Sequence, residues 1–291
     1  MLLQIEHTTE YRYAEAVGLT PHLLRLIPRS SPGLHLIRSG LKVSTEHDIR
    51  WNLDLEGNIL GLATFPGVTE NLVIKSSLLI EQHLTNPFDF LLEGRALHLP
   101  FTYDDRELSL AEPFLKRRDE DSMGPLDEFA RPFLNGTSSR PSTLGVLTAI
   151  NRAIPALFQY TERYEEGVRM AWETLVYRAG TCRDFAHLFI ETARALGIAA
   201  RYVSGYLCSS PGEPGENHTH GWCELYLPGA GWRGFDPTNG ILAGPHHIAV
   251  ATSLVAGEIP PLQGTYCGEA GLCTAHEVVI TARELLPGEE P

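Results

Sequence analysis

The stretch that most constrains the fold is GTCRDFAHLFIETARALG, residues 180–197. Between its two end glycines there is no other glycine or proline, and Thr181 is a good N-cap for a helix that begins at the next residue. Apolar side chains recur with helical spacing at Phe185, Phe189, Ala193 and Leu196. The pattern predicts a buried helix over 182–196, with Gly197 as a left-handed C-cap.

Cys182 therefore lies in the first turn of the predicted helix. Backbone N–H groups there have no helical partner, and the positive end of the helix dipole lies close by. This environment favours the thiolate, which is the nucleophilic form of cysteine. A small apolar residue packed at a helix start is the commoner role of a lone cysteine, so other residues must decide between the two.

Composition limits the partners and the location. A length of 291 residues suits about two domains of ~150 residues. The net charge of −13 argues against nucleic acid or an anionic membrane as a partner. Five thinly spread cysteines do not form a disulfide framework. We see neither a signal peptide nor an apolar run of the ~18 residues that a spanning helix needs, so we expect a cytoplasmic protein.

Periodicity divides the chain into three parts and predicts an α+β protein. Residues 1–93 contain short alternating runs separated by Asn, Pro and Gly, which predicts an N-terminal antiparallel β sandwich or barrel-like domain. Residues 94–140 are interrupted by prolines and are expected to be a connector. Residues 141–291 form the second domain, and its tail around Ile280 is expected to close an edge of its own sheet. If the two domains are separate cores, residues 1–92 should fold alone.

A nucleophilic thiol needs a base to take its proton, and the base needs an acceptor that orients it. His220 lies in a predicted strand (218–227), and Asp236 ends the next one (232–236). Helix cysteine, strand histidine and aspartate on the neighbouring strand is the chain order of papain-like thiol enzymes. Order alone is weak support, because many chains contain Cys, His and Asp in that order.

The two strands set a geometric requirement. Directly opposed residues of an antiparallel pair share a face, and a slip of one residue reverses every side chain. His220 and Asp236 therefore share a face only if the numbers of paired residues have an even sum. We expect a loop over 227–229 with Gly229 left-handed, which makes the sum 456 and places Asp236 directly opposite His220.

Longer blocks of sequence surround these residues. In the second half they are GTCRDFAH (180–187), ARYVSGY (200–206), HGW (220–222) and GWRGFDPTN (231–239). In the first half they are HTTEYRY (7–13), LRLIP (24–28) and DLEGN (54–58). Together these blocks closely resemble the bacterial transglutaminase-like proteins and the β domain that accompanies their core.

The resemblance implies a papain-like core in which Cys182 is the nucleophile, His220 the base and Asp236 the orienting carboxylate. It implies no cofactor and no metal, and nothing resembles the calcium sites of the animal enzymes. One departure is Gly221, where the family usually has alanine, a small residue in place of another. Trp172 cannot be matched to the oxyanion tryptophan of the animal transglutaminases. We therefore expect the backbone N–H of Cys182 to be one oxyanion donor.

These residues predict a thiol-dependent acyl-transfer enzyme that attacks a peptide or carboxamide carbonyl and forms a thioester. The substrate would be a peptide, a protein or a small amide. If water resolves the thioester the enzyme is a protease or amidase, and if an amine does so it is a cross-linking enzyme. We favour hydrolysis, because no feature visibly builds an amine site.

Two other classes stay open. A catalytically idle scaffold could use the same fold, although it has no need of Cys182, His220 and Asp236 together. A His-rich metalloprotein is the other alternative, and no Cys-x-x-Cys or His-Glu-x-x-His spacing supports it. Its possible ligands are His218, His220, His246, His247, Cys208 and Cys223.

Overall fold

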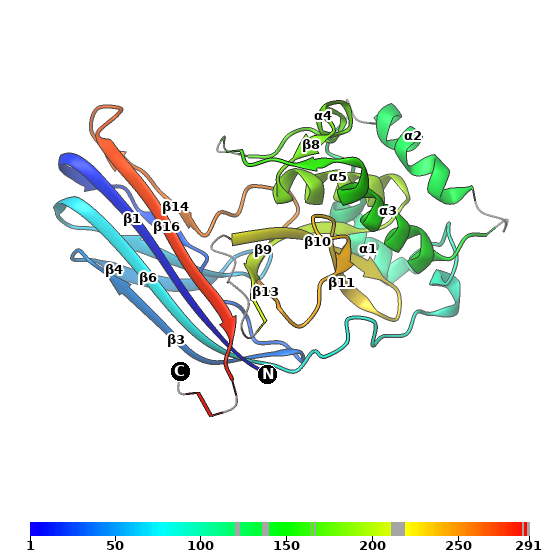
Figure 1. The fold of residues 1–291 in the computed structure, drawn as a ribbon, viewed down its shortest axis with the longest axis horizontal. Coiled ribbons are helices and arrows are strands. Elements are labelled where there is room, and N and C mark those ends of the chain that lie inside the picture. The colour runs from blue at the N-terminus through cyan, green and yellow to red at the C-terminus, as the bar shows by residue number, and fades with distance from the viewer. Residues whose placement is uncertain are drawn as a thin grey trace.

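The computed structural model describes residues 1–119, 123–135, 140–163, 165, 167–210, 219–286 and 288–289. Figure 1 shows an elongated lobe of long strands beside a second lobe in which helices surround a shorter sheet. The strand-rich part comes first in the chain and the helices follow, so the α+β class agrees with the prediction.

The first lobe is built on a long antiparallel sheet. Its strands are β1 (Leu2–Leu19), β3 (Leu34–Val43), β6 (Val68–Gln82), β15 (Tyr266–Cys267) and β16 (Cys273–Glu284). Buried residues alternate along β1, from Leu3 and Ile5 to His7 and Thr9. Because side chains alternate across a strand, these four residues lie on one face of the sheet.

A second antiparallel sheet covers one end of the first. In spatial order its strands are β14 (Leu262–Gln263), β2 (His22–Leu24), β5 (Ile59–Thr64) and β4 (Asp48–Leu53). Residues of both sheets share one apolar core, which includes Leu24 of β2, Ala63 of β5 and Leu72 of β6. The lobe is therefore a two-sheet sandwich at this end.

The C-terminal tail belongs to the first lobe. β16 pairs antiparallel with β1 from Leu3 to Tyr13 and contributes the buried Ile280 and Ala282. The expectation that the tail closes an edge of the second domain's sheet is wrong, and residues 141–291 are shared between the two lobes. The alternating pattern identified a strand but carried no information about its partner.

Helices begin in the segment expected to be a connector. The helices are η1 (Gly94–Ala96), α1 (Asp105–Leu115), α2 (Met123–Leu134), α3 (Thr143–Leu157), α4 (Ala171–Tyr177) and α5 (Cys182–Ala195). Leu126 of α2 is fully buried in the core that surrounds α5. Residues 94–140 thus form part of the second lobe's core and do more than connect the two domains.

α5 packs on the sheet of the second lobe, which runs in the order β12-β11-β10-β9-β13 among the described residues. Its strands are β9 (Ala200–Leu207), β10 (Thr219–Leu227), β11 (Gly231–Asp236), β12 (Ile241–Leu242) and β13 (His247–Ser253). A parallel pair, β7 (Gln159–Tyr160) with β8 (Ala179–Gly180), lies just before α5. Phe185 and Phe189 of α5 share the core with Cys223 of β10 and Phe235 of β11.

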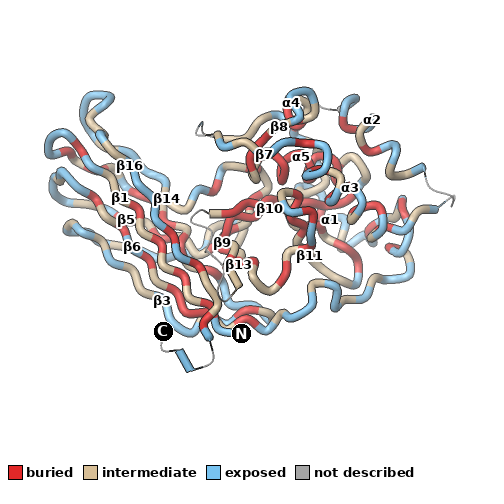
Figure 2. Tube along the Cα trace, viewed as in Figure 1, coloured by how far each residue is buried: buried red, intermediate tan, exposed pale blue. Residues whose placement is uncertain are grey.

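The two lobes share a continuous interface. Tyr206 of β9 and Ile248 of β13 pack in one buried cluster with Leu3, Ile5 and Ile280 of the first lobe. Figure 2 shows that the long strands are buried where they approach β9 and β13 and exposed at their far ends.

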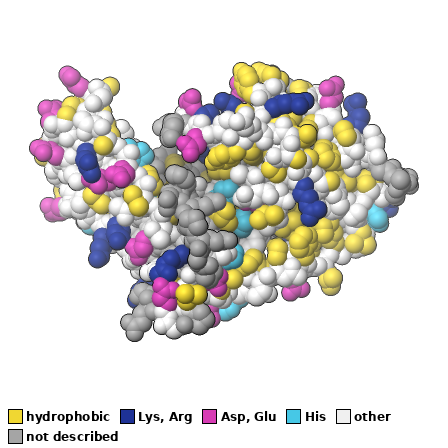
Figure 3. Space-filling view, in the orientation of Figure 1, with side chains coloured by type: hydrophobic (Ala, Val, Ile, Leu, Met, Phe, Trp, Pro, Cys, Tyr) yellow, Lys and Arg dark blue, Asp and Glu magenta, His cyan; other side chains and the backbone are white. Residues whose placement is uncertain are grey.

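Apolar side chains gather on the surface over the helix-bearing lobe, whereas charges of both signs are spread over the strand-rich lobe (Figure 3). Within the described residues, no helix is both long and apolar enough to cross a bilayer.

Candidate active site

The helix that carries Cys182 is capped as predicted. The Thr181 side chain accepts a hydrogen bond from the N–H of Asp184, and the Asp184 carboxylate accepts one from the N–H of Thr181 at 2.9 Å. This capping box fixes the first turn. Gly197 has φ +77, which is the left-handed conformation expected at the C-cap. Cys182 is partly exposed and free.

Asp184 locks the start of this helix to the segment before it. Arg163 Nη2 donates to its carboxylate at 2.9 Å, and so does the backbone N–H of Arg169 at 2.8 Å. Burial would raise the pKa of Asp184, but these hydrogen bonds hold it below the ordinary value. A Cβ on Gly180 would lie 2.8 Å from Asp184 Cβ, so only glycine allows this approach. The residues flanking Cys182 thus fix the position of the thiol.

β10 and β11 place His220 and Asp236 on one face of the sheet. The paired residue numbers sum to 458, which is even, as the triad requires. Gly229 has φ +87, as predicted. The predicted loop is nevertheless wrong by one residue, because it spans 228–230 and not 227–229. Asp236 is therefore diagonal to His220 and not directly opposite it.

The diagonal arrangement still brings the two side chains together. His220 Nε2 lies 2.9 Å from Asp236 Oδ2, and both residues are buried. Burial would lower the pKa of His220, but hydrogen bonds to Asp236 and to Cys182 raise it to about 10. Because Nε2 faces Asp236, Nδ1 is the ring nitrogen left for Cys182. The structure thus brings together all three residues that the sequence singled out.

Other residues besides His220 also form hydrogen bonds with Asp236. Asn239 Nδ2 donates to Oδ2 at 2.8 Å, and the N–H of Thr238 donates to Oδ1 at 2.9 Å. His247 Nε2 lies 3.1 Å from Oδ2. Burial would raise the pKa of Asp236, but the hydrogen bonds from His220 and His247 lower it strongly. Asp236 is therefore a fixed carboxylate.

His247 acts as a neutral donor to this carboxylate. Its Nδ1 accepts a hydrogen bond from the N–H of Gly244 at 3.1 Å, so Nδ1 presents its lone pair. The ring proton must then be on Nε2, directed at Asp236. Both nitrogens of His247 are occupied, so this histidine orients Asp236.

Trp222 supports both histidine rings. Its indole stacks on His220 with ring centroids 6.0 Å apart and meets His247 edge to face at 5.3 Å. A Cβ on Gly205 would lie 2.7 Å from Trp222 Cη2, and one on Gly234 would lie 3.4 Å from Trp222 Nε1. Gly205, within one of the sequence blocks, therefore leaves room for the indole on β9, whereas a Cβ on Gly234 would make only an ordinary contact with it.

Sequence reasoning missed the roles of Asn239 and His247. Asn239 lies three residues after Asp236, and an asparagine in a turn after a strand often bonds back to nearby groups, so a local signal existed. His247 was considered only as a metal ligand. No local pattern links β13 to the end of β11, so its role could not have been found from the sequence.

The same residues form the one cluster, within the described ranges, that could close around a cation. Ligand atoms of His220, Asp236 and His247 lie within 4.8 Å of one another. Direct hydrogen bonds already join these atoms, and His247 directs a proton, not a lone pair, at the centre. The donor chemistry therefore favours a hydrogen-bonded triad over a metal site. His218 lies outside the described residues, and Cys223 Sγ instead donates to a backbone carbonyl.

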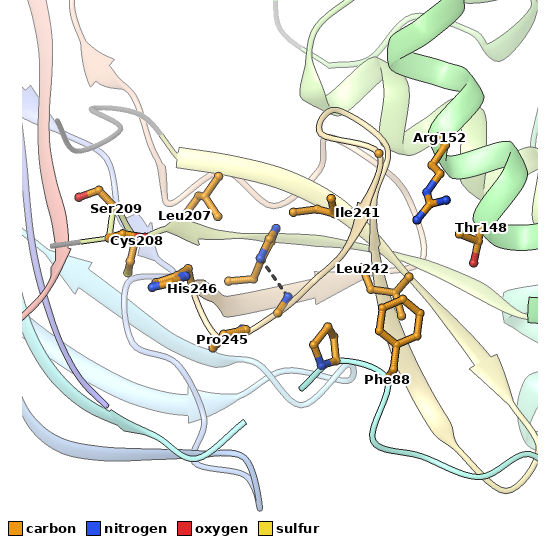
Figure 4. Close-up of a pocket in the computed structure, with 15 residues that line it drawn as sticks. Phe88, Thr148, Arg152, Leu207, Cys208, Ser209, Ile241, Leu242, Pro245 and His246 are labelled. Carbon is orange, nitrogen blue, oxygen red and sulfur yellow. Dashed lines mark hydrogen bonds between the residues drawn. The ribbon is translucent and has the colours of Figure 1, made fainter. Parts of the chain in front are cut away.

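Several cavities border this array. One of about 290 Å³ contains Cys182, His220 and Tyr202. A larger one of about 580 Å³ reaches His247 but neither Cys182 nor His220. Figure 4 shows Arg152 and Thr148 of α3 facing the larger cavity from one side. Of these cavities, it is the smaller one that the thiol of Cys182 lines. Trp172 of α4 is not among the described residues that line it.

The chain matches two family models. The bacterial transglutaminase-like N-terminal region covers residues 3–81, and the transglutaminase-like superfamily covers residues 130–237. Cys182, His220 and Asp236 all lie within the second match. An uncharacterized protein of Mycobacterium tuberculosis (strain ATCC 25618 / H37Rv) is 31% identical over 282 residues, covering 90% of this chain and 86% of the relative.

A solved structure from Cytophaga hutchinsonii, named only provisionally as a cysteine protease, has the same fold. It has a TM-score of 0.71 and 20% identity, and the match covers 100% of this chain and 93% of that one. The predicted transglutaminase-like core behind an N-terminal β domain is therefore confirmed. The chain belongs to the transglutaminase-like superfamily and carries the bacterial N-terminal region of that family.

Proposed function

We propose that the protein is a thiol-dependent acyl-transfer enzyme that hydrolyses peptide or carboxamide bonds, with Cys182, His220 and Asp236 as its catalytic triad. The observation that carries the proposal is the position of His220, which interacts with the thiol on one side and with a fixed carboxylate on the other. The helix N-terminus adds support, because its dipole favours a thiolate at Cys182.

In the acylation step, the Cys182 sulfur attacks the carbonyl carbon of the substrate. The carbonyl electron pair moves to oxygen, and the backbone N–H of Cys182 at the helix start is the expected donor to this oxyanion. When the C–N bond breaks, the His220 imidazolium gives its proton to the leaving amine. The products are a thioester on Cys182 and a neutral imidazole.

In the deacylation step, neutral His220 takes a proton from water, and the resulting hydroxide attacks the thioester carbonyl. The C–S bond breaks, the acid is released and the thiolate–imidazolium pair is restored. Asp236 stays ionised throughout, and its role is to hold Nε2 and stabilise the cation. We favour water over an amine as the acceptor because the described residues at the cavity build no recognisable amine site.

We propose a peptide, protein or small amide as the substrate and the cytoplasm as the location. Support for the location is that all five cysteines are free. The net charge of −13 speaks against a nucleic acid partner or an anionic membrane. An idle scaffold would not need the hydrogen-bond network that fixes Asp236, which weakens that alternative.

The test is to label the protein with a library of electrophilic peptide amides and to compare wild type with Cys182→Ala. We expect saturable labelling of wild type at Cys182, located by mass spectrometry, and none in the variant. His220→Ala should slow labelling by about 10²-fold or more. Uniform labelling of all five cysteines would contradict the proposal. Methylamine added to turnover assays then separates hydrolysis from amine transfer, because amide products would show transfer.

A further inference from the structure

One wall of the Cys182 cavity is a segment that the first lobe holds at both ends. Gly257, Ile259, Pro260 and Pro261 make up this wall. They lie in the connection from β13 to β14, and β14 is a strand of the first lobe. The segment that forms the wall therefore runs from the second lobe's sheet to the first lobe.

The near end of the segment is held by the turn over residues 54–58. Asn58 Oδ1 accepts the N–H of Thr252 at 2.8 Å, and Asn58 Nδ2 donates to the Thr252 carbonyl at 2.8 Å. Glu56 Oε1 accepts the N–H of Leu254 at 2.6 Å. Asp54 orders the turn by accepting the N–H of Asn58 at 2.8 Å. Because Asn58 is 4% exposed, water cannot readily replace these hydrogen bonds.

The far end is held by β2 and the residue that follows it. The backbone N–H of Arg25 donates to the Pro261 carbonyl at 2.8 Å, and Arg25 Nη1 donates to the Pro260 carbonyl at 3.4 Å. Directly beyond, Leu262 pairs with Leu24. The first lobe thus bonds to residues 252–254 and 260–262 at the two ends of the wall. The second lobe holds it as well, because Arg194 of α5 donates to the Leu254 carbonyl at 2.8 Å and Ile259 packs in the core around α5.

The wall offers the cavity an apolar surface. Pro260 and Pro261 have no N–H to donate, and their carbonyls are engaged by Arg25. Ile259 adds an aliphatic side chain. We infer that the N-terminal domain determines substrate specificity by positioning this wall against an apolar side chain next to the reacting carbonyl of a peptide. The inference rests on the proposed function, since it assumes that Cys182 reacts with the substrate.

The test measures the labelling rate of Cys182 with three reagents. Iodoacetamide is small and reports only the reactivity of the thiol. Two benzyloxycarbonyl-dipeptide chloromethyl ketones differ in one residue next to the reacting unit, phenylalanine or glycine. We expect wild type to prefer the phenylalanine reagent by about tenfold, as burial of an apolar side chain allows. The preference should appear in the binding constant of the reagent and not in its maximal rate.

Three substitutions test whether the first lobe determines this preference for the phenylalanine reagent. Asn58→Ala should reduce it to within about twofold while leaving the iodoacetamide rate unchanged. Glu56→Ala should act in the same direction, and Glu56→Gln, which keeps an acceptor for Leu254, should restore the preference. Asn71→Ala is the matched control, because Asn71 is an exposed asparagine of β6 that bonds only within the first lobe. Circular dichroism establishes that each variant is folded.

Retention of the preference in both Asn58→Ala and Glu56→Ala would overturn the inference. So would a wild type that does not distinguish the two ketones, or an equal loss of rate with all three reagents in a folded variant. If Asn58→Ala does not fold, the inference is tested by comparing Glu56→Ala with Glu56→Gln. Reaction at another cysteine would contradict the proposed function itself, and mass spectrometry of the labelled peptide distinguishes that failure.

Discussion

The hydroxyl of Tyr202 fills the space that a side chain on Gly221 would need. A Cβ at position 221 would collide with this hydroxyl and lie 3.1 Å from two atoms of the ring. Tyr202 lines the Cys182 cavity, and burial, followed by the neighbouring thiol, raises the pKa of the phenol. Gly221 stands where the bacterial transglutaminase-like proteins usually have alanine. The glycine is therefore needed here because Tyr202, on the neighbouring strand β9, occupies the space of an alanine methyl group.

Gly221→Ala should accordingly destabilise the protein, although from the sequence it exchanges one small residue for another. Forcing a methyl group against the buried Tyr202 should lower the free energy of unfolding by about 1–3 kcal/mol. Displacement of the ring into the cavity should also slow labelling of Cys182. In the double variant Gly221→Ala/Tyr202→Phe the collision with the hydroxyl is gone, so stability and labelling should partly recover. Urea unfolding and labelling rates measure both; a stable, fast-labelling single variant would contradict the packing argument.

The local features of the site could be read from the sequence because short-range physics determines them. The cap at Thr181, the left-handed Gly197 and the helix that positions Cys182 all depend on neighbours within four residues. The parity of the β10–β11 hairpin was also predictable, since only an even sum lets His220 meet Asp236. The loop was misplaced by one residue because several three-residue loops satisfy that parity.

The features that the sequence did not reveal depend on contacts between distant segments. β16 pairs with β1, at the opposite end of the chain, and an alternating pattern does not specify such a partner. The contact of Asn58 with Thr252 requires the two assembled lobes, and that of His247 with Asp236 requires the assembled sheet of the second lobe. Long-range pairing is set by the whole packed structure, whereas propensity and capping are local.

Asp236→Ala should remove the group that keeps His220 protonated. The hydrogen bond and charge of Asp236 help to raise the pKa of His220 to about 10, while burial acts in the opposite direction. Without the carboxylate, only Cys182 opposes the effect of burial, so the pKa of His220 should fall from about 10 toward its ordinary value of 6.5. The measurement is an NMR titration of 13C-labelled histidine. In His247→Gln, which leaves Asp236 in place, the pKa of His220 should stay well above 6.5.

The same shift has a consequence for stability. Because the folded pKa of His220 is raised, its contribution is complete below about pH 6.5 and is lost as pH rises toward 10. Wild type should therefore lose more stability than Asp236→Ala between these two pH values. Urea midpoints measured across the window give the comparison. Parallel curves for the two proteins would show that His220 is not coupled to Asp236.

His7 should make the interface between the lobes sensitive to acid. Its Nδ1 lies 2.8 Å from the hydroxyl of Tyr206, and burial lowers the pKa of His7 from 6.5 to about 4. In the unfolded chain the ring is protonated below about pH 6.5, so the native state loses stability as pH falls from 6.5 to 4, by at most about 3 kcal/mol. His7→Gln should flatten this dependence in urea unfolding. An unchanged dependence would mean that other groups cause it.

The C-terminal tail should stabilise the N-terminal lobe, because β16 pairs with β1. β16 covers an edge of β1 along most of its length and contributes Ile280 and Ala282 to the core shared by the lobes. A chain that ends at Gly271 should therefore expose that edge, and amides of β1 should exchange with solvent about 100-fold faster or more. A chain that ends at Leu285 keeps all of β16 and should match the full protein. Hydrogen exchange followed by mass spectrometry resolves the peptides of β1 in both chains. Full protection of β1 in the shorter chain would show that the N-terminal lobe is complete without the tail.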